Sequence, residues 1–216
     1  MSCKKGENMD FVSVQEHYDL LVKEGHDPIN DPPILKNYMD KWDGQFFINA
    51  LSLTPSSNVL EIGIGTGRLA KKVLIEGCNH LTGIDISTLS IEQAKLNLCK
   101  WENISFITDD FLSHTFSRKF DIIYCSLVFF HINDKKSAIS KVSKLLNNSG
   151  TFVLSISIDQ DTAINYGSIY GPRTVMLFPD DLDETIDLIK SSGILVDNII
   201  NTEFAHIIVA KKTYLL

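Results

Sequence analysis

The sequence has no long hydrophobic run, although 44% of its 216 residues are hydrophobic. A membrane-spanning helix needs about 18 or more consecutive apolar residues, so nothing here predicts one. The first ten residues, MSCKKGENMD, contain two lysines but are not followed by the apolar segment of a secretory signal. These absences predict a cytoplasmic protein that has no membrane partner.

Cysteine is scarce and irregularly placed. The four cysteines, Cys3, Cys78, Cys99 and Cys125, show no Cys-x-x-Cys motif and no Cys/His ligand spacing. Isolated cysteines of this kind in a chain without an export signal are most simply reduced, mostly buried thiols. The pattern predicts no metal site.

Clusters of positive charge are also missing. The formal net charge is −7, and lysine and arginine form no cluster larger than pairs such as Lys71-Lys72 and Lys135-Lys136. Nonspecific binding of nucleic acid requires several cations on one face. The charge pattern therefore argues against nucleic acid as a partner, and it gives no indication of the oligomeric state.

The chain does contain an alternation of short apolar runs and amphipathic segments. Residues 11–53 have helical spacing and are divided by the proline-rich stretch HDPINDPP, with Gly25 ending one helix and another starting near Pro32. Strands are then predicted over 59–62, 81–86, 104–107, 120–128 and 151–158, with helices between them. Gly150 stands where a glycine would end the helix over 134–146. Residues 159–173 read as an irregular excursion.

The last part of the chain predicts one more helix, over 181–190, and two strands, over 194–200 and 204–210. Because only a few residues join these two strands, they should pair antiparallel. Strands that alternate with amphipathic helices form a parallel sheet covered on both faces. We therefore predict one α/β domain with a doubly wound, seven-stranded sheet that is mostly parallel and has an antiparallel edge hairpin. Residues 1–53 form an N-terminal helical cap, 54–158 a ligand-binding core, and 159–216 an insertion and the strand pair.

The segment VLEIGIGTGRLA, from Val59 to Ala70, contains the first motif that indicates a ligand. Glycines after the first strand allow a ligand to approach the backbone, and the next helix begins with free N–H donors. A dinucleotide site would require a third glycine at the position of Arg68. Glu61 just before the loop would also repel a pyrophosphate. The acid-x-Gly-x-Gly-x-Gly pattern instead favours a ligand that carries a cationic group.

From Val59 to about Ile158 the chain resembles the class I S-adenosylmethionine-dependent methyltransferases, and the motifs come in that family's order. VLEIGIGTGRLA resembles the first motif, and LTGIDIS places Asp85 where the family's acid binds the ribose hydroxyls. FITDDF resembles the adenine-contacting corner, which implies that Asp110 and the backbone of Phe111 bind adenine, with Asp109 as the alternative to Asp110. FDIIYCSLVFFHIND and KLLNNSGTFVLSIS resemble the fourth and fifth strands of small-molecule methyltransferases.

The resemblance implies a Rossmann-like fold, S-adenosylmethionine as cofactor, S-adenosylhomocysteine as product, and a small molecule as methyl acceptor. It also implies a set of cofactor-binding residues: Glu61, Gly63, Gly65, Gly67, Arg68, Asp85, Ile86, Asp110, Phe111 and Ser126. The charges of these residues agree with this cofactor, because two carboxylates, Glu61 and Asp85, suit a nucleoside with a positively charged tail.

Several roles remain open at this level. Arg68 is either a solvated side chain in the first turn of a helix or a contact to the cofactor's carboxylate. His131, just after the fourth strand, is either a catalytic base or a packing residue. Tyr18 and Trp42, the candidate substrate residues, either close over the cofactor or fill the core of the cap. Two other functional classes also remain, a non-catalytic S-adenosylmethionine-binding module and an NAD-linked oxidoreductase.

Overall fold

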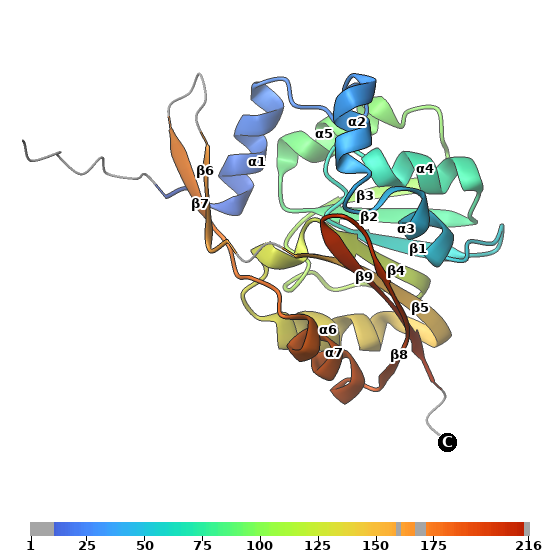
Figure 1. Ribbon diagram of the computed structural model, residues 1–216. Coiled ribbons are helices and arrows are strands. Elements are labelled where there is room, and N and C mark those ends of the chain that lie inside the picture. The colour runs from blue at the N-terminus through green and yellow to red at the C-terminus, as the bar shows by residue number, and fades with distance from the viewer. Residues whose placement is uncertain (1–10, 159–160, 167–171, 214–216) are drawn as a thin grey trace, which may run out of the picture.

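The computed structural model describes residues 11–158, 161–166 and 172–213. Its centre is a seven-stranded sheet with the order β3-β2-β1-β4-β5-β9-β8 (Figure 1). The strands are β1 (Asn58–Ile62), β2 (His80–Asp85), β3 (Ile104–Thr108), β4 (Phe120–Ser126), β5 (Leu146–Ser157), β8 (Ile194–Asn201) and β9 (Ala205–Lys212). Strands β1 to β5 pair in parallel, and β9 is antiparallel to both β5 and β8. The predicted fold class is therefore confirmed.

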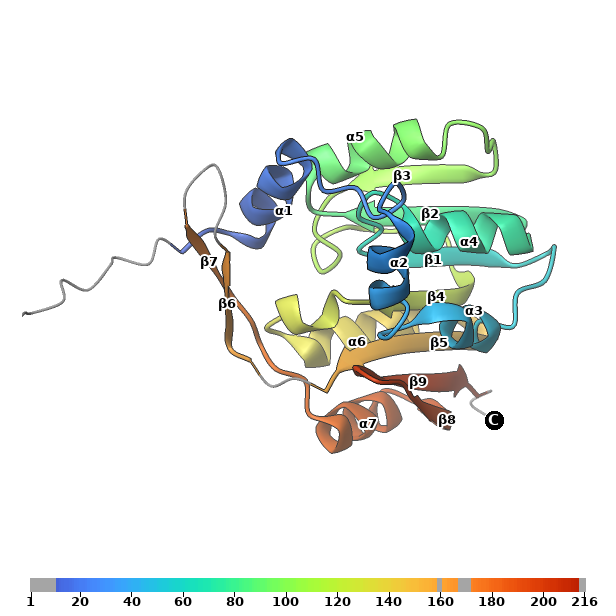
Figure 2. The same ribbon diagram turned by 45° about the horizontal axis from the view of Figure 1, so that its top comes forward.

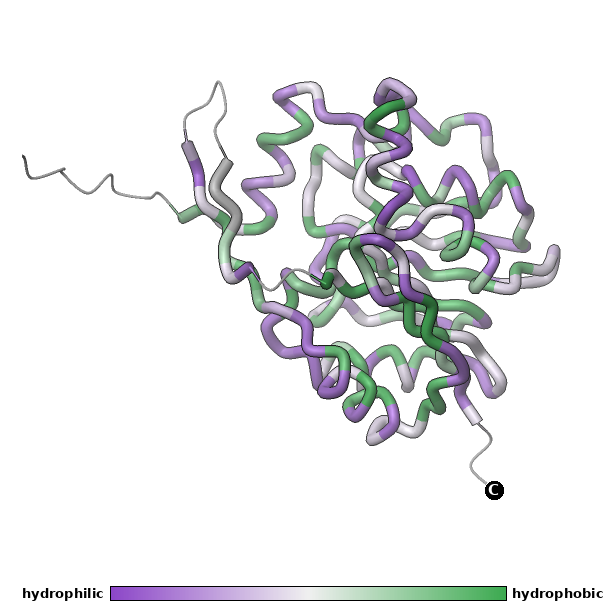
Figure 3. The backbone as a smooth tube through the Cα atoms, viewed as in Figure 1, coloured by the Kyte–Doolittle hydropathy of each residue, from purple (hydrophilic) through white to green (hydrophobic). Residues whose placement is uncertain are grey.

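Helices cover both faces of this sheet and create two hydrophobic cores. One core joins the sheet to α3 (Gly44–Ala50), α4 (Arg68–Glu76) and α5 (Thr88–Asn97). The other joins it to α6 (Lys135–Leu145) and α7 (Leu182–Ser191), which lie on the opposite side (Figure 2). Figure 3 shows hydrophobic residues concentrated in the central strands, whereas hydrophilic and hydrophobic residues alternate along the outer helices. The alternation leaves an apolar stripe for packing on α4, α6 and α7.

The N-terminal cap consists of α1 (Val14–Lys23), α2 (Pro33–Met39) and α3. Ser13 caps α1 by accepting a hydrogen bond from the Glu16 N–H, and Gly25 adopts a left-handed φ of +85° just after the helix. Pro33 is the first residue of α2, a position where its missing N–H costs nothing. These starts and stops agree with the sequence analysis, which did not separate α3 from the rest of the cap.

A second, two-stranded sheet lies apart from the main one. Strands β6 (Ala163–Tyr166) and β7 (Arg173–Met176) form an antiparallel hairpin beside α1, and we call this hairpin the arm (Figures 1 and 2). Phe11 pairs with Thr174 as an isolated bridge, so the chain entering α1 also lies along β7. The sequence predicted only an irregular excursion here, and residues 159–160 and 167–171 of that segment lie outside the described part.

The expectation for Gly150 was wrong. Helix α6 ends at Leu145, its C-cap Leu146 is already extended, and β5 runs from Leu146 through Gly150 to Ser157. A Cβ atom at Gly150 would lie 2.9 Å from the Asn147 carbonyl oxygen and 3.1 Å from the Asp121 carbonyl oxygen. Glycine is therefore explained by a close backbone approach inside the strand, and not by a helix end.

Among the described residues, no helix is both long enough and apolar enough to span a bilayer. Three of the cysteines are free thiols, with Cys78 and Cys125 buried and Cys99 exposed. Cys3 lies outside the described residues. The same residues contain no group of three or more histidine, cysteine, aspartate or glutamate side chains arranged for a metal ion.

Candidate functional site

A cavity of about 520 Å³ opens where β1, β2 and β4 end at their carboxyl edges. This volume is within the range of small-molecule sites, about 300–1,000 Å³. The cavity brings together predicted site residues from six separate segments: Tyr18, Glu61, Gly63, Gly65, Arg68, Asp85, Ile86, Asp109, Asp110, Phe111, Ser126 and His131. In doubly wound sheets this edge is where ligands bind, because the strand order reverses there.

The glycine loop after β1 forms the floor of the cavity. Gly63 has a φ of +75°, and a Cβ atom there would come within 2.2 Å of Val128, a residue of the loop after β4. Gly65 has a φ of +54°, but a Cβ atom there would have no neighbour within 4 Å. Gly63 is thus required by packing, whereas Gly65 leaves open space on the side where a ligand would lie.

Asp85 is held at the end of β2 by backbone donors. One carboxylate oxygen accepts from the Gly65 N–H at 2.8 Å, and the other accepts from the Ser87 N–H at 2.9 Å. Burial raises the pKa of Asp85, and these two hydrogen bonds oppose the rise. Each oxygen still has a lone pair, so the carboxylate is fixed in place and remains able to accept from a ligand hydroxyl.

Glu61 is almost completely buried at the end of β1, with only 3% of its surface exposed. Its Oε2 atom accepts a hydrogen bond from the Tyr124 hydroxyl at 2.7 Å. Burial raises the pKa of Glu61 to about 8, and the hydrogen bond and the charge of Arg68 only partly oppose it. The raised pKa favours the protonated form of Glu61, whereas the sequence analysis treats it as a carboxylate.

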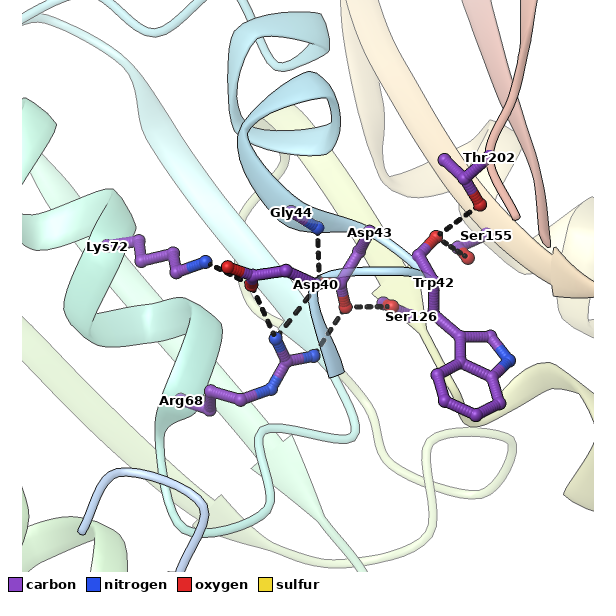
Figure 4. A network of polar contacts seen from close by, with 9 residues as sticks. All are labelled: Asp40, Trp42, Asp43, Gly44, Arg68, Lys72, Ser126, Ser155 and Thr202. Carbon is purple, nitrogen blue, oxygen red and sulfur yellow. Dashed lines mark hydrogen bonds and ion pairs between the residues drawn. The ribbon is translucent and has the colours of Figure 1, made fainter. Parts of the chain in front are cut away.

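Arg68, the first residue of α4, is engaged by the cap. Both of its terminal nitrogens pair with the carboxylate of Asp43, one of them at 2.9 Å, as Figure 4 shows. Asp43 is fully buried and also accepts from the Ser126 hydroxyl at 2.9 Å and from the Gly44 N–H at 2.6 Å. Neither role considered from the sequence, solvation or a contact to a cofactor carboxylate, included this ion pair.

The loop after β3 places two acids at the cavity. Asp109 accepts from the Asp110 N–H at 2.8 Å and pairs with His114 at 2.9 Å, and His114 holds the pKa of Asp109 below its usual value. Asp110 accepts from the Leu112 N–H at 2.9 Å. Phe111, which follows Asp110, is buried in the core. Both acids line the cavity, so both remain candidates for the contact with adenine.

His131 and Tyr18 meet on the opposite wall. His131 ends a short 3₁₀ helix, η1 (Phe129–His131), and its Nε2 atom lies 2.9 Å from the Tyr18 hydroxyl. The buried Nδ1 atom of His131 has no hydrogen-bond partner among the described residues. Burial, reinforced by His17 and Lys135, lowers the pKa of His131 to about 4. The imidazole is thus neutral at pH 7, with Nε2 engaged by Tyr18 and Nδ1 buried.

Two predicted residues lie elsewhere. Gly67, the residue just before α4, does not line the cavity. It packs against Leu98 and has a φ of +97°. Trp42 lines a smaller cavity of about 150 Å³ and stacks near Phe204 and Tyr38. In Figure 4 its indole points away from the Asp43–Arg68 pair.

Two acids of the cap were not singled out from the sequence. Asp43 precedes Gly44 at the start of α3, and an Asp-Gly pair before a helix is a recognisable N-cap signal. Asp19 of α1 accepts from the Ser87 hydroxyl at 2.6 Å and from the Leu89 N–H at 3.0 Å, so it caps α5 from another helix. No local pattern indicates such a cap, because donor and acceptor lie on different elements.

Comparison with known proteins agrees with this geometry. A family model described as Nodulation protein S (NodS) matches residues 13–207. Nodulation protein S of Rhizobium tropici is 23% identical over 190 residues, which cover 86% of this chain and 78% of that protein. An uncharacterized methyltransferase of Bacillus mycoides (strain KBAB4) is 40% identical over 108 residues, which cover 48% of this chain and 50% of that one.

A solved structure shares the fold. It is the crystal structure of the N-methyltransferase NodS from Bradyrhizobium japonicum WM9 in complex with S-adenosyl-l-homocysteine. The TM-score is 0.67 at 20% sequence identity, and the match covers 91% of this chain and 98% of that one.

Proposed function

The chain belongs to the Nodulation protein S family, and from this membership we propose that it transfers a methyl group from S-adenosylmethionine to an amino group of a small molecule. Membership also confirms the resemblance to class I methyltransferases. The observation that supports the proposal best is the single cavity that joins Asp85, Glu61 and the glycine loop to His131. The proposal that the methyl group goes to a nitrogen atom rests on the solved relative, which is an N-methyltransferase.

The residues present fit S-adenosylmethionine. Asp85 would accept from the ribose hydroxyls, and Asp110 with the Phe111 backbone would hold the adenine. We favour Asp110 over Asp109 because His114 already occupies Asp109. Glu61 would face the charged amino-acid part, since a nearby cation favours the ionised form of a carboxyl group. Gly65 leaves the space that a ligand against the backbone requires. Bound S-adenosylmethionine supplies a methyl group already activated by its sulfonium charge.

The protein's own contribution is then alignment and the exclusion of water. A pKa of about 4 makes His131 a weak base at neutral pH. We therefore assign it a hydrogen-bonding role and not that of a general base. That hydrogen bond joins its Nε2 atom to the Tyr18 hydroxyl, and the pair would form the wall against which the acceptor amine lies. This contact would direct the nitrogen lone pair at the methyl carbon.

The charge of the cavity mouth suits an acceptor that arrives as a cation. Asp109 and Asp134 line the cavity, and hydrogen bonds hold the pKa of each below its ordinary value, so both are ionised. Arg68, the cation nearest the glycine loop, is neutralised by Asp43. An ammonium group would therefore be attracted to the mouth and would lose its proton to solvent before methyl transfer.

The test measures binding and turnover separately. Calorimetry with S-adenosylhomocysteine should show that Asp85→Ala weakens binding by about 1.5–3 kcal/mol, the value of a charge-assisted hydrogen bond. Ser105→Ala, on the neighbouring strand β3 and outside the cavity lining, is the control and should bind as the wild type does. Incubation with a set of amines should then release S-adenosylhomocysteine. Binding without release from any acceptor would favour a non-catalytic module, and unchanged affinity in Asp85→Ala would contradict the proposed site.

A further inference from the structure

His17, the residue before Tyr18 in α1, makes a buried polar contact with the arm, whereas Tyr18 contacts His131. His17 is 4% exposed, and its Nδ1 atom accepts a hydrogen bond from Nε of Arg173 at 3.0 Å. Arg173 belongs to β7 of the arm, and its two terminal nitrogens pair with both oxygens of Glu24 at the end of α1. Because arginine cannot accept a hydrogen bond, His17 must carry its proton on Nε2.

These contacts form one continuous chain of buried groups. It runs from Glu24 through Arg173 to His17, whose ring meets the ring of Tyr18 edge-on at 5.2 Å between centroids. Tyr18 then reaches Nε2 of His131 at 2.9 Å. The ion-paired side chains of Arg173 and Glu24 are only 3% and 6% exposed, so water screens them little.

The chain that leaves β7 also holds the element that carries His131. The Phe178 N–H donates to the Phe130 carbonyl inside η1 at 2.7 Å. The Lys135 ammonium donates to the carbonyls of Phe129 and Phe178 and pairs with Asp180. Residues 173–180 therefore contact both partners of the Tyr18–His131 pair, α1 on one side and η1 on the other.

We infer that Arg173 is a positioning residue for the Tyr18–His131 pair, and that the arm thereby sets the geometry of the acceptor side of the cavity. The inference deepens the proposed function and rests on it. The physical reason is the rigidity of the contact: the planar guanidinium fixes His17 and Glu24 at the same time, and both lie on the helix that carries Tyr18. A hydrogen bond of 2.9 Å weakens steeply when one partner shifts or turns, so a loosened α1 would release His131.

Titratable and charged groups face both histidines. His17 is surrounded by Arg173, Glu24 and His26, and His131 by Tyr18, His17 and Lys135. Burial lowers the pKa of both imidazoles to about 4, so both are neutral at pH 7. Their ¹⁵N shifts will therefore report the tautomer and the hydrogen bonds and not a mixture of charge states.

The experiment is long-range ¹H–¹⁵N NMR of the histidine side chains in the full chain at pH 7. Signals are assigned with His17→Gln and His131→Gln. Tyr18→Phe defines the spectrum of His131 without its partner. Arg173→Met removes the whole contact, and Arg173→Lys keeps the charge but loses the planar fork. Lys212→Met is the control, because that lysine donates to the carbonyls of Ser143 and Leu146, far from η1.

We expect Arg173→Met to move the His131 signals toward those of Tyr18→Phe, Arg173→Lys to move them less, and Lys212→Met to leave them unchanged. Affinity for S-adenosylhomocysteine should stay within about twofold in the Arg173 and Lys212 variants, since neither residue lines the cavity. A wild-type His131 spectrum in both Arg173 variants would overturn the inference, and if Arg173→Met does not fold, Arg173→Lys alone decides it.

A second readout separates the inference from the proposed function. With an amine that is turned over, Arg173→Met and Tyr18→Phe should lower kcat by similar factors, and the double variant should lower it no further. Independent, multiplying losses would contradict the inference. Absence of turnover with every amine would count against the proposed function alone, because the NMR comparison needs no acceptor.

Discussion

Glu61 shows how a single buried carboxyl group can depend on its ligand. It lies next to Asp85 and Asp43, whose negative charges add to the effect of burial in raising its pKa to about 8. In the unfolded chain the same group has a pKa of about 4.5. The folded protein therefore binds one more proton than the unfolded chain between these two values, so this group's contribution to stability is lost as the pH rises from about 4.5 to 8.

We expect Glu61→Gln to change this pH dependence in a defined way. The amide cannot ionise, so the variant should lose less stability than the wild type between pH 5 and pH 8. The difference in the free energy of unfolding should reach a few kcal/mol, on the order of 1.4 kcal/mol per pH unit. Urea denaturation at both pH values measures it, with Glu203→Gln, at an exposed ion pair, as the control. Parallel pH dependence in wild type and Glu61→Gln would show that Glu61 is ionised throughout.

His131 gives a second prediction at the scale of one residue. His131→Ala should lower kcat about 10²-fold with an amine acceptor, because a small misalignment of the reacting atoms has an effect of that size. Affinity for S-adenosylhomocysteine should change little. With a pKa near 4, His131 should add no ionisation to the rate profile between pH 5 and 9, and any rise should follow the acceptor amine. A limb with a pKa near 6.5 that disappears in the variant would show that His131 works as a base.

At the scale of elements, the cap is attached to the core by buried polar contacts from two of its segments. Asp43 binds Arg68 of α4 and Ser126 of β4, and Asp19 of α1 caps α5. The partners of Asp43 line the cavity, and those of Asp19 lie at the start of α5, just after Asp85 and Ile86 of the cavity wall. Attachment by hydrogen bonds, in contrast to a purely apolar contact, fixes the orientation of α1 and α3 over the strand ends.

Removing Asp43 should therefore be costly. Asp43→Ala removes both close contacts of the largely buried Arg68 and leaves it only the 3.9 Å pair with the exposed Asp40, so it should lower the free energy of unfolding by about 3–5 kcal/mol. Asp43→Ala/Arg68→Met should recover part of that loss, because the uncompensated charge is gone. Lys41→Met, which breaks an exposed ion pair between the cap and Glu203, should cost less than about 1 kcal/mol. A loss as small in Asp43→Ala as in Lys41→Met would contradict the view that this pair holds the cap.

For the molecule as a whole, the cavity lies between the sheet edge and the cap, so a ligand there contacts both. S-adenosylhomocysteine at about 100 times its Kd should add about 2.7 kcal/mol to the free energy of unfolding. A thermal melt should show the corresponding rise in Tm, and Asp85→Ala should reduce it. NADH should leave the Tm unchanged, because the loop has Arg68 at the position of the third glycine of a dinucleotide site. A rise with NADH equal to that with S-adenosylhomocysteine would favour an oxidoreductase.

Much of the fold was determined by the sequence alone. Strand and helix alternation and the antiparallel last pair follow from periodicity and from residues within a few positions of each other. The glycine loop and Asp85 belong to the same class, because each stands at a strand end that the pattern marks. The prediction for Gly150 was wrong because a helix end and a close backbone contact inside a strand both favour glycine, and no local pattern distinguishes them.

The state and the partners of the site residues were decided only by the tertiary structure. Arg68 meets an aspartate 25 residues away, Tyr18 a histidine 113 away, and Arg173 a histidine 156 away. The raised pKa of Glu61 is equally a product of folding, because burial and two neighbouring acids cause it. Local sequence determines which backbone conformation is favourable, whereas charge state and hydrogen-bond partner depend on which distant groups share the same buried space.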